Sequence, residues 1–539
     1  MGWAVVVAAA LLGPALVGLA SLSTGALAAP SEAVPVVSGP SNIGEGATLP
    51  EILSAGDRAR YHAIFALQRA GNWAAADREM REVKNPILMG AVLRQRFLAP
   101  GYHSRYGELA EWLTHYAAEP QADEIYALAE RRKPRGDRPT PPRAPELGQF
   151  TFGGTSAHGG TAPGTEPAAA TRPDHPPGTI RPLEWRLGLA AWLKHDYPVA
   201  AKHFAALARS SDASVWDVTA GAFWAARAYA RSRDPGPVDD MLVLAANYPR
   251  TFYGLLAARQ LGQDVSFSWD IDPSRYDDFA KLARIPGVER AIALYEVGEP
   301  ALAGQEVEWL YEHANPGLAK LLLALAGHID VPAAAIRMGE DWRLAHGEAI
   351  DSALYPVPPW RPSGGFTIDR ALLCAFMRQE SAFDAKAESH AGAKGLMQLM
   401  PATASLIAGD HSPRDDRHAQ LFTPEYNIDL GQRYLQRLLA CDAVHGNLLL
   451  LAAAYNAGPG TIRRWQKTAG ATKDPLLFVE TLPSAETRIF VERVMAGFWL
   501  YQERLGQDPQ TLDVLAGGKW PYYVAEDETT VVAADYAGN

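Results

Sequence analysis

Glu380 is the residue of this chain best placed for acid–base chemistry. It follows Phe376 by four residues and Met377 by three, so on a helix its side chain projects from the same stripe as these apolar side chains. Partial burial there disfavours the carboxylate and raises its pKa, which makes the group a general acid able to protonate a glycosidic oxygen. The alternative is the polar end of a core helix, ion-paired with a residue such as Arg378.

Two motifs follow Glu380 in a fixed order, and their order and spacing carry more information than either motif by itself. Residues 395–401 read Gly-Leu-Met-Gln-Leu-Met-Pro, with Gln398 as the one polar side chain among apolar neighbours. An amide at that position could hold a sugar hydroxyl or acetamide group. The alternative is a helix that starts at Pro401 after a short apolar strand.

The second motif ends a buried helix with polar residues. Residues 453–459 read Ala-Ala-Tyr-Asn-Ala-Gly-Pro, so Tyr455 and Asn456 emerge where glycine and proline stop the helix. The Tyr455 hydroxyl could orient the acid, or it could be a core tyrosine with a satisfied hydroxyl. Glu486 falls in the first turn of the last long helix, where the helix dipole provides ~0.3–1 kcal/mol and a structural reason for a carboxylate.

The helix that carries Glu380 has its own start signal. Thr367 is predicted as the N-cap, with Asp369 in the first turn.

The chain is predicted to be mostly α. Its 539 residues exceed one hydrophobic core. From Leu49 to His346 the pattern is almost entirely amphipathic helix, with tight turns followed by small residues near positions 70–76, 195–201 and 297–303. This indicates an α-helical superhelical solenoid of TPR-like hairpins, with an ordinary helical bundle as the alternative.

Composition predicts the domain limits. Residues 133–182 are rich in proline and glycine and form a flexible insertion in a solenoid of residues 49–355. A proline-rich stretch at 356–362 opens a catalytic domain of residues 356–506. A partly disordered tail of residues 507–539 follows, in which Trp520 could pack back on the body.

The N-terminus carries an export signal. An apolar run from Val5 to Leu22 precedes Ala26-Leu27-Ala28, which predicts a signal peptide of residues 1–28, followed by a flexible segment of residues 29–48. Residues 1–3 contain no Lys or Arg, so an uncleaved N-terminal anchor is the alternative. We expect the mature protein to be peripheral to a membrane at most.

Charge and motif content exclude several function classes. A formal net charge of −11 argues against nucleic acid as a partner. No zinc, phosphate-loop or serine-hydrolase motif is present, so we expect no metal and no cofactor. Cys374 and Cys441 lie in apolar stretches and are interpreted as two separate core thiols, with a disulfide bridge between them as the alternative.

Five blocks together resemble the soluble lytic transglycosylases of family 1, over residues 366–501. The blocks are Glu380-Ser381, residues 392–401, Asn427-Ile428 with Gly431 and Tyr434-Leu435, residues 454–459, and Glu486-Thr487-Arg488. The resemblance implies a goose-type lysozyme-like catalytic domain after the solenoid. It also implies a periplasmic location, with peptidoglycan glycan strands, and possible further cell-wall enzymes, as partners.

The resemblance further implies a reaction. Such enzymes cleave the β-1,4 bond between N-acetylmuramic acid and N-acetylglucosamine and close a 1,6-anhydro ring on the muramic residue. Glu380 would act first as the acid and then as the base. The expected substrate-binding residues are Ser381, Met397, Gln398, Tyr455, Asn456 and Glu486. Phe490 departs from the family pattern, in which tyrosine is more common.

Two other functions stay open. A muramidase would hydrolyse the same bond with water activated by a second carboxylate such as Asp410, Asp415 or Glu425. A peptidoglycan-binding scaffold without catalysis would also fit a helical solenoid.

Overall fold

The predicted mostly-α class is confirmed. A computed structural model describes residues 49–147, 181–269, 281–409, 419–468 and 473–527. Over these ranges the chain forms helices and no strand, and extended pairing is confined to isolated bridges such as Lys394 with Leu399. The predicted signal peptide, the segment 29–48 and most of the 133–182 insertion lie outside the described residues.

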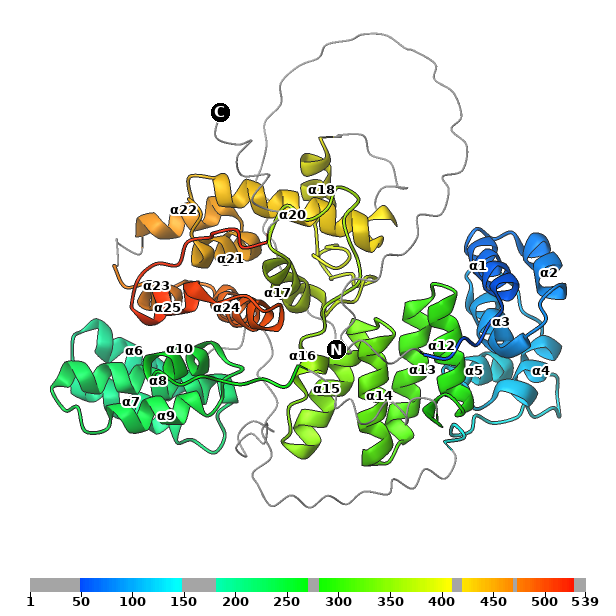
Figure 1. Cartoon of the computed structure of the whole chain (residues 1–539), viewed down its shortest axis with the longest axis horizontal. Coiled ribbons are helices and arrows are strands. Elements are labelled where there is room, and N and C mark those ends of the chain that lie inside the picture. The colour runs from blue at the N-terminus through cyan, green and yellow to red at the C-terminus, as the bar shows by residue number, and fades with distance from the viewer. Residues whose placement is uncertain (1–48, 148–180, 270–280, 410–418, 469–472, 528–539) are drawn as a thin grey trace, which may run out of the picture.

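The solenoid part consists of three groups of helices (Figure 1). The first group is α1 (Ala55–Arg69), α2 (Trp73–Arg81), the short 3-10 helix η1 (Pro86–Leu88), α3 (Met89–Leu98), α4 (Tyr106–Tyr116) and α5 (Ala122–Arg132). The second is α6 (Leu183–Leu193), α7 (Tyr197–Ala208), α8 (Val215–Ser232), α9 (Val238–Ala246) and α10 (Phe252–Gln260). The third is α12 (Pro286–Glu296), α13 (Pro300–His313), α14 (Pro316–His328), α15 (Pro332–His346) and α16 (Asp351–Leu354).

The three predicted hairpin junctions are the turns α1–α2, α6–α7 and α12–α13. Asn72 caps α2 by accepting a hydrogen bond from the Ala75 amide, and Asp196 caps α7 in the same way. Gly71 and Gly298 adopt positive φ in two of these turns, a conformation that glycine takes without strain. Local sequence therefore explains each hairpin.

The groups do not follow one another in space as they do in sequence. The Glu296 carboxylate of α12 accepts hydrogen bonds from the amides of Ile52 and Leu53, which precede α1 (2.7 and 2.9 Å). The group α1–α5 thus packs on α12–α13, whereas α6–α10 lies at the opposite side of the molecule, beneath α23–α25 (Figure 1).

The C-terminal part is a compact set of helices around α17. It contains α17 (Arg370–Ser381), α18 (Pro401–Ala408), α20 (Pro424–Ala440), α21 (Leu448–Ala457), α22 (Pro459–Thr468), α23 (Pro475–Glu480), α24 (Ala485–Arg504) and α25 (Gln510–Ala516). The buried helices α17 and α24 pack along each other, and a Cβ added at Gly497 of α24 would lie in van der Waals contact with Ala375 of α17, 3.4 Å from its Cβ.

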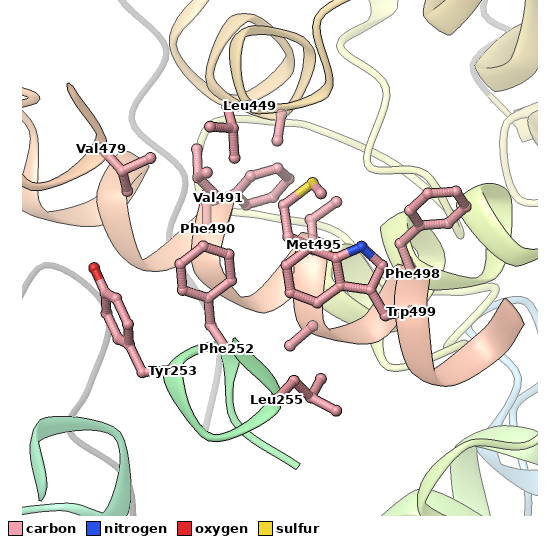
Figure 2. Close-up of a cluster of buried hydrophobic side chains, with 14 of the residues drawn as sticks. Phe252, Tyr253, Leu255, Leu449, Val479, Phe490, Val491, Met495, Phe498 and Trp499 are labelled. Atoms are coloured by element: carbon pink, nitrogen blue, oxygen red, sulfur yellow. The ribbon is translucent and has the colours of Figure 1, made fainter. Parts of the chain in front are cut away.

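One apolar core runs from α6–α10 into the C-terminal helices. Phe252 of α10 stacks on Trp499 of α24, with ring centroids 5.5 Å apart and an interplanar angle of 14°. Figure 2 shows this contact together with Val491 and Met495 of α24. The predicted boundary at residue 356 remains a prediction, because buried side chains are continuous across it.

The start of α17 differs from the sequence prediction. The N-cap residue is Asp369, not Thr367, whose hydroxyl is buried without a hydrogen-bond partner. The Asp369 carboxylate turns away from the helix and accepts hydrogen bonds from the amides of Glu526 and Asp527, each at 3.1 Å. The Asp527 carboxylate accepts a hydrogen bond from the Arg370 amide at 2.8 Å, and it thereby satisfies the first backbone amide of α17.

The tail predicted as partly disordered is therefore docked as far as residue 527. Trp520 contacts Phe478 with ring centroids 5.4 Å apart, and the Tyr523 amide donates to the Gly446 carbonyl oxygen at 2.8 Å. Residues 528–539 lie outside the described ranges. Both cysteines are free thiols, and burial raises the pKa of Cys374 to about 12.

Candidate active site

Glu380 lies in the last turn of α17, at the edge of the buried stripe formed by Phe376 and Met377. Its side chain is half-buried. Burial, and then the negative charge of Glu486, raise the pKa of Glu380 to about 8. Within the described ranges no hydrogen bond or ion pair engages its carboxyl group, so Glu380 is predominantly a neutral acid at pH 7.

The structure contradicts a pairing of Glu380 with Arg378. The Arg378 guanidinium points toward the solenoid, where it lies over the Tyr355 ring (4.6 Å) and donates to the Leu354 carbonyl oxygen (2.9 Å). It also pairs with Glu340 of α15 at 3.3 Å. Arg378 is thus bound to residues of the solenoid and does not pair with Glu380.

A tight loop at residues 387–400 borders Glu380, and one amide organises it. Asn427 of α20 is fully buried. Its Oδ1 accepts from the Met397 amide (2.8 Å), and its Nδ2 donates to the carbonyl oxygens of Lys394 (3.0 Å) and Leu421 (2.8 Å). Asn427 was not among the predicted site residues, although a polar residue in the apolar stripe of a helix was a usable signal.

Two predicted substrate-binding residues, Ser381 and Gln398, form hydrogen bonds within this loop. The Ser381 hydroxyl donates to the Leu396 carbonyl oxygen (2.8 Å) and so ties α17 to the loop. Gln398 adopts φ 43°, and its Nε2 donates to the carbonyl oxygens of Ala387 (3.1 Å) and Gly395 (2.9 Å).

Met397 lies at the buried end of the loop. Its side chain has no exposed surface and packs against Gly431, where an added Cβ would lie 2.7 Å from Met397 Cγ. Its amide and carbonyl oxygen are bonded to Asn427 and Tyr455, so in this conformation Met397 supports the loop. A direct contact between Met397 and a substrate stays a prediction.

Tyr455 joins the loop to the helix that carries the acid. Its hydroxyl donates to the Met397 carbonyl oxygen at 2.7 Å rather than to Glu380. Its ring lies against Phe376 (centroids 4.7 Å apart) and parallel to the buried Phe490 (6.3 Å, 7°). Burial and the nearby Glu380 raise the pKa of Tyr455 well above its usual value.

Tyr434 of α20 is a second tyrosine near the acid, and it was not predicted as a site residue. Its ring centroid is 5.3 Å from that of Tyr455. Burial is the largest cause of a Tyr434 pKa of about 12, and the charge of Glu380 contributes. Its only signal in the sequence was its place in the resemblance block.

Asn456 and Glu486 meet across two helices. Asn456 Nδ2 donates to Glu486 Oε1 (3.4 Å), and Asn456 Oδ1 accepts from the Thr487 hydroxyl (2.7 Å). The Ser484 hydroxyl caps α24 by accepting from the Thr487 amide (3.2 Å). These contacts hold the half-buried Glu486 carboxylate in place, and its negative charge raises the pKa of Glu380.

Of the other candidate carboxylates, only Glu425 lies within the described residues, and it does not join this group. Glu425 is exposed in the first turn of α20, and Asp410 and Asp415 lie outside the described residues. Across the described ranges no three His, Cys, Asp or Glu side chains are arranged to hold a metal ion. The site therefore consists of two carboxylic acids, two tyrosines and polar amides around one loop.

Residues 362–478 match the transglycosylase SLT domain, so this part of the chain belongs to that domain family. The match encloses Glu380, the loop and Tyr455, and ends before Glu486. The chain is 32% identical over 262 residues to a soluble lytic murein transglycosylase of Salmonella typhimurium, and 31% identical over 279 residues to that of Escherichia coli. The predicted resemblance to soluble lytic transglycosylases is confirmed.

These alignments cover 48% and 50% of this chain but 40% and 42% of the two relatives, so the match spans less than half of their length. The fold is similar to the crystal structure of the 70 kDa soluble lytic transglycosylase of Escherichia coli. The TM-score is 0.50 at 20% identity, over 84% of this chain and 72% of that chain. This similarity confirms the predicted architecture of a helical superhelix with a lysozyme-like domain.

A further solved structure shares the fold. It is a complex of the 70 kDa soluble lytic transglycosylase with bulgecin A, with a TM-score of 0.50 and 24% identity over 64% of this chain and 54% of that chain. Among the described helices, none combines the length and apolar character needed to cross a membrane.

Proposed function

We propose that this protein is a lytic transglycosylase. It cleaves the β-1,4 bond between N-acetylmuramic acid and N-acetylglucosamine in peptidoglycan and leaves 1,6-anhydro-muramic ends. The SLT domain match and the similarity to soluble lytic murein transglycosylases support the class of reaction. The observation that carries the proposal is the position of Glu380 in the last turn of α17, beside the buried Phe376 and Met377, where burial and the charge of Glu486 raise its pKa to about 8.

Glu380 performs both proton transfers. Its carboxylic acid protonates the glycosidic oxygen as the bond to the muramic C1 breaks, which releases the N-acetylglucosamine hydroxyl. The resulting carboxylate then takes the proton from the muramic C6 hydroxyl while that oxygen bonds to C1. The acid is regenerated, and no water is consumed.

The neighbouring residues divide into two roles. Gln398, Asn456 and Glu486 bring amide and carboxylate groups to the rim of the site and bind sugar hydroxyl or acetamide groups. Ser381, Met397 and Tyr455 act through the loop, because their hydrogen bonds and packing fix its backbone.

A muramidase is the second candidate, and one observation favours it. Glu486 is a second carboxylate whose charge reaches Glu380, and hydrolytic glycosidases use such a pair, one acid and one carboxylate. In that case Glu486, rather than the Glu425, Asp410 or Asp415 considered from the sequence, would activate water.

Mass spectrometry of muropeptides released from purified sacculi decides between the two reactions. A transglycosylase releases products one water lighter than their reducing counterparts. Reducing ends would establish the muramidase, and a wild-type protein that binds sacculi without releasing muropeptides would establish the non-catalytic scaffold.

The substrate sets the location. Peptidoglycan lies outside the inner membrane, so we propose that the protein acts in the periplasm after export by residues 1–28. Other cell-wall enzymes as partners remain a prediction.

A further inference from the structure

A buried cluster of charged side chains joins the solenoid to the segment that carries Glu486. Arg181, which precedes α6, lies at its centre. Its guanidinium pairs with Asp217 of α8 (3.2 Å) and with Glu480 at the end of α23 (3.4 Å), and it donates a short hydrogen bond to Glu492 of α24. One side chain of the solenoid thus holds two helices of the catalytic domain.

The cluster is removed from solvent. The four side chains are between 0% and 7% exposed. Burial opposes the charge of Arg181, yet the carboxylates, Glu480 foremost, raise its pKa above the usual value. Burial also raises the pKa of Glu492. An arginine that serves several buried carboxylates cannot be lost without leaving uncompensated charge, which is costly in a protein interior.

The surrounding polar groups do not replace Arg181. The Tyr253 hydroxyl of α10 donates to Glu480, and the Ser214 hydroxyl donates to Asp217 at 3.0 Å. The other nearby cation, Arg488 of α24, donates to the Leu482 carbonyl oxygen, and burial lowers its pKa. Arg181 is therefore the cation that bridges the solenoid and the catalytic domain at this point.

The cluster is connected to Glu486 through the chain. Glu480 ends α23 and Glu492 lies on α24, and Glu486 lies between them in the first turn of α24. Glu486 accepts the hydrogen bond from Asn456, and its charge acts on Glu380. Figure 2 shows α10, with Tyr253, against the same stretch of chain near Val479.

We propose that Arg181 is a positioning residue for the catalytic acid: by holding α23 and α24 together, it fixes where Glu486 stands relative to Glu380. The inference rests on the proposed function. Without Arg181, α23 and α24 would lose the side chain that pairs with both Glu480 and Glu492, and Glu486 would be free to move with the turn between them. Glu380 would then lose its proton at a lower pH.

The test is the pH profile of muropeptide release by the full chain with Arg181→Met. The titratable groups that face Glu380 are Glu486 from α24, Tyr455 from α21 and Tyr434 from α20, and of these Glu486 is the one whose negative charge raises the pKa of Glu380. We expect the basic limb of the profile to move down by roughly half a pH unit, the scale on which a displaced neighbouring charge acts. Activity should fall more at pH 8 than at pH 6.

Arg290→Met is the matched control. Arg290 is also a buried cation between carboxylates, pairing with Glu306 (3.0 Å) and Glu119 (3.7 Å), but it lies among α12, α13 and the α4–α5 turn. Its loss should lower the melting temperature without moving the basic limb. A purely structural role for Arg181 would give the same pattern as this control.

A double variant sharpens the test. In a Glu486→Gln background the charge that Arg181 positions is absent, so adding Arg181→Met should leave the basic limb where Glu486→Gln alone puts it.

A folded Arg181→Met protein with the wild-type limb would overturn the proposal. If Arg181→Met does not fold, Arg181→Lys takes its place, because one ammonium group cannot reach three carboxylates in the geometry of the guanidinium. Wild-type protein that releases no muropeptides would instead overturn the proposed function.

Discussion

The negative charge of Glu486 favours the protonated form of Glu380. It is the second cause, after burial, of the raised Glu380 pKa. The two carboxyl groups come from helices that are a hundred residues apart in the chain, α17 and α24, yet they belong to one site. Their environments differ, since Glu486 accepts a hydrogen bond from Asn456 whereas no described group bonds to Glu380. This asymmetry assigns the acid to Glu380.

Glu380→Gln should remove most of the lytic activity. A positioned acid–base group contributes ~10²–10⁴-fold to a rate, and glutamine keeps the size of the side chain but carries no transferable proton. Muropeptide release from sacculi measures the loss, and pull-down with sacculi should show that binding remains. Glu425→Gln is the control, since Glu425 is exposed and should be dispensable. Unchanged turnover in Glu380→Gln would contradict the mechanism.

The same substitution should stabilise the protein at neutral and basic pH. The folded-state pKa of Glu380, about 8, exceeds the ordinary value of 4.5 for a glutamate side chain, so the folded chain binds more protons between these values. Stability must then fall as pH rises from about 4.5 to about 8. Glu380→Gln removes this cost, which is on the order of 4 kcal/mol at pH 8. Thermal unfolding at pH 5 and pH 8 should show the gain at pH 8 only.

Glu486→Gln should shift the basic limb of the activity profile to lower pH. The shift should be well under the full displacement of the Glu380 pKa, because burial is the larger cause and remains. Activity near pH 6 should change less than activity near pH 8. A complete loss at every pH, together with reducing ends from the wild type, would instead favour the muramidase.

Gly395→Ala should disrupt the loop beside Glu380. Gly395 has φ +75°, and an added Cβ would lie 2.1 Å from the Leu421 carbonyl oxygen and 2.5 Å from Asn427 Nδ2. Strain and overpacking together should cost about 2–4 kcal/mol. Gly392→Ala is the matched control, because Gly392 also has positive φ (+85°) but open space around it. Denaturant unfolding and muropeptide release should both separate the two variants.

Asp527→Ala should weaken the start of α17. It removes the acceptor for the Arg370 amide and for Gln507 Nε2 (2.7 Å), a loss of about 1 kcal/mol for a cap. Amide exchange in the first turn of α17 should become faster. Asp513→Ala serves as the control, because its pair with Arg259 is exposed and contributes little. Equal exchange in both variants would show that the tail does not cap the helix.

Local sequence was sufficient for the helices and for the acid. Helical periodicity placed Glu380 beside Phe376 and Met377, and the cap and glycine signals placed the hairpin turns. The same reasoning was wrong at Thr367. The N-cap position is occupied by Asp369, and the carboxylate that accepts from the first amide of α17 belongs to Asp527, which lies 157 residues beyond Arg370. No local pattern could indicate a cap from so distant a part of the chain.

The sequence by itself determined the class of fold, the loop motif and the place of Glu380 on its helix, since these depend on periodicity and on residue types at short spacing. Only the tertiary structure decided which of those residues contact one another. In it the Met397 side chain is buried, the Tyr455 hydroxyl donates to a backbone carbonyl group, and the charge of Glu486 acts on Glu380. The reason is physical: burial and charge act through space, so the pKa of Glu380 depends on groups that the chain order does not place beside it.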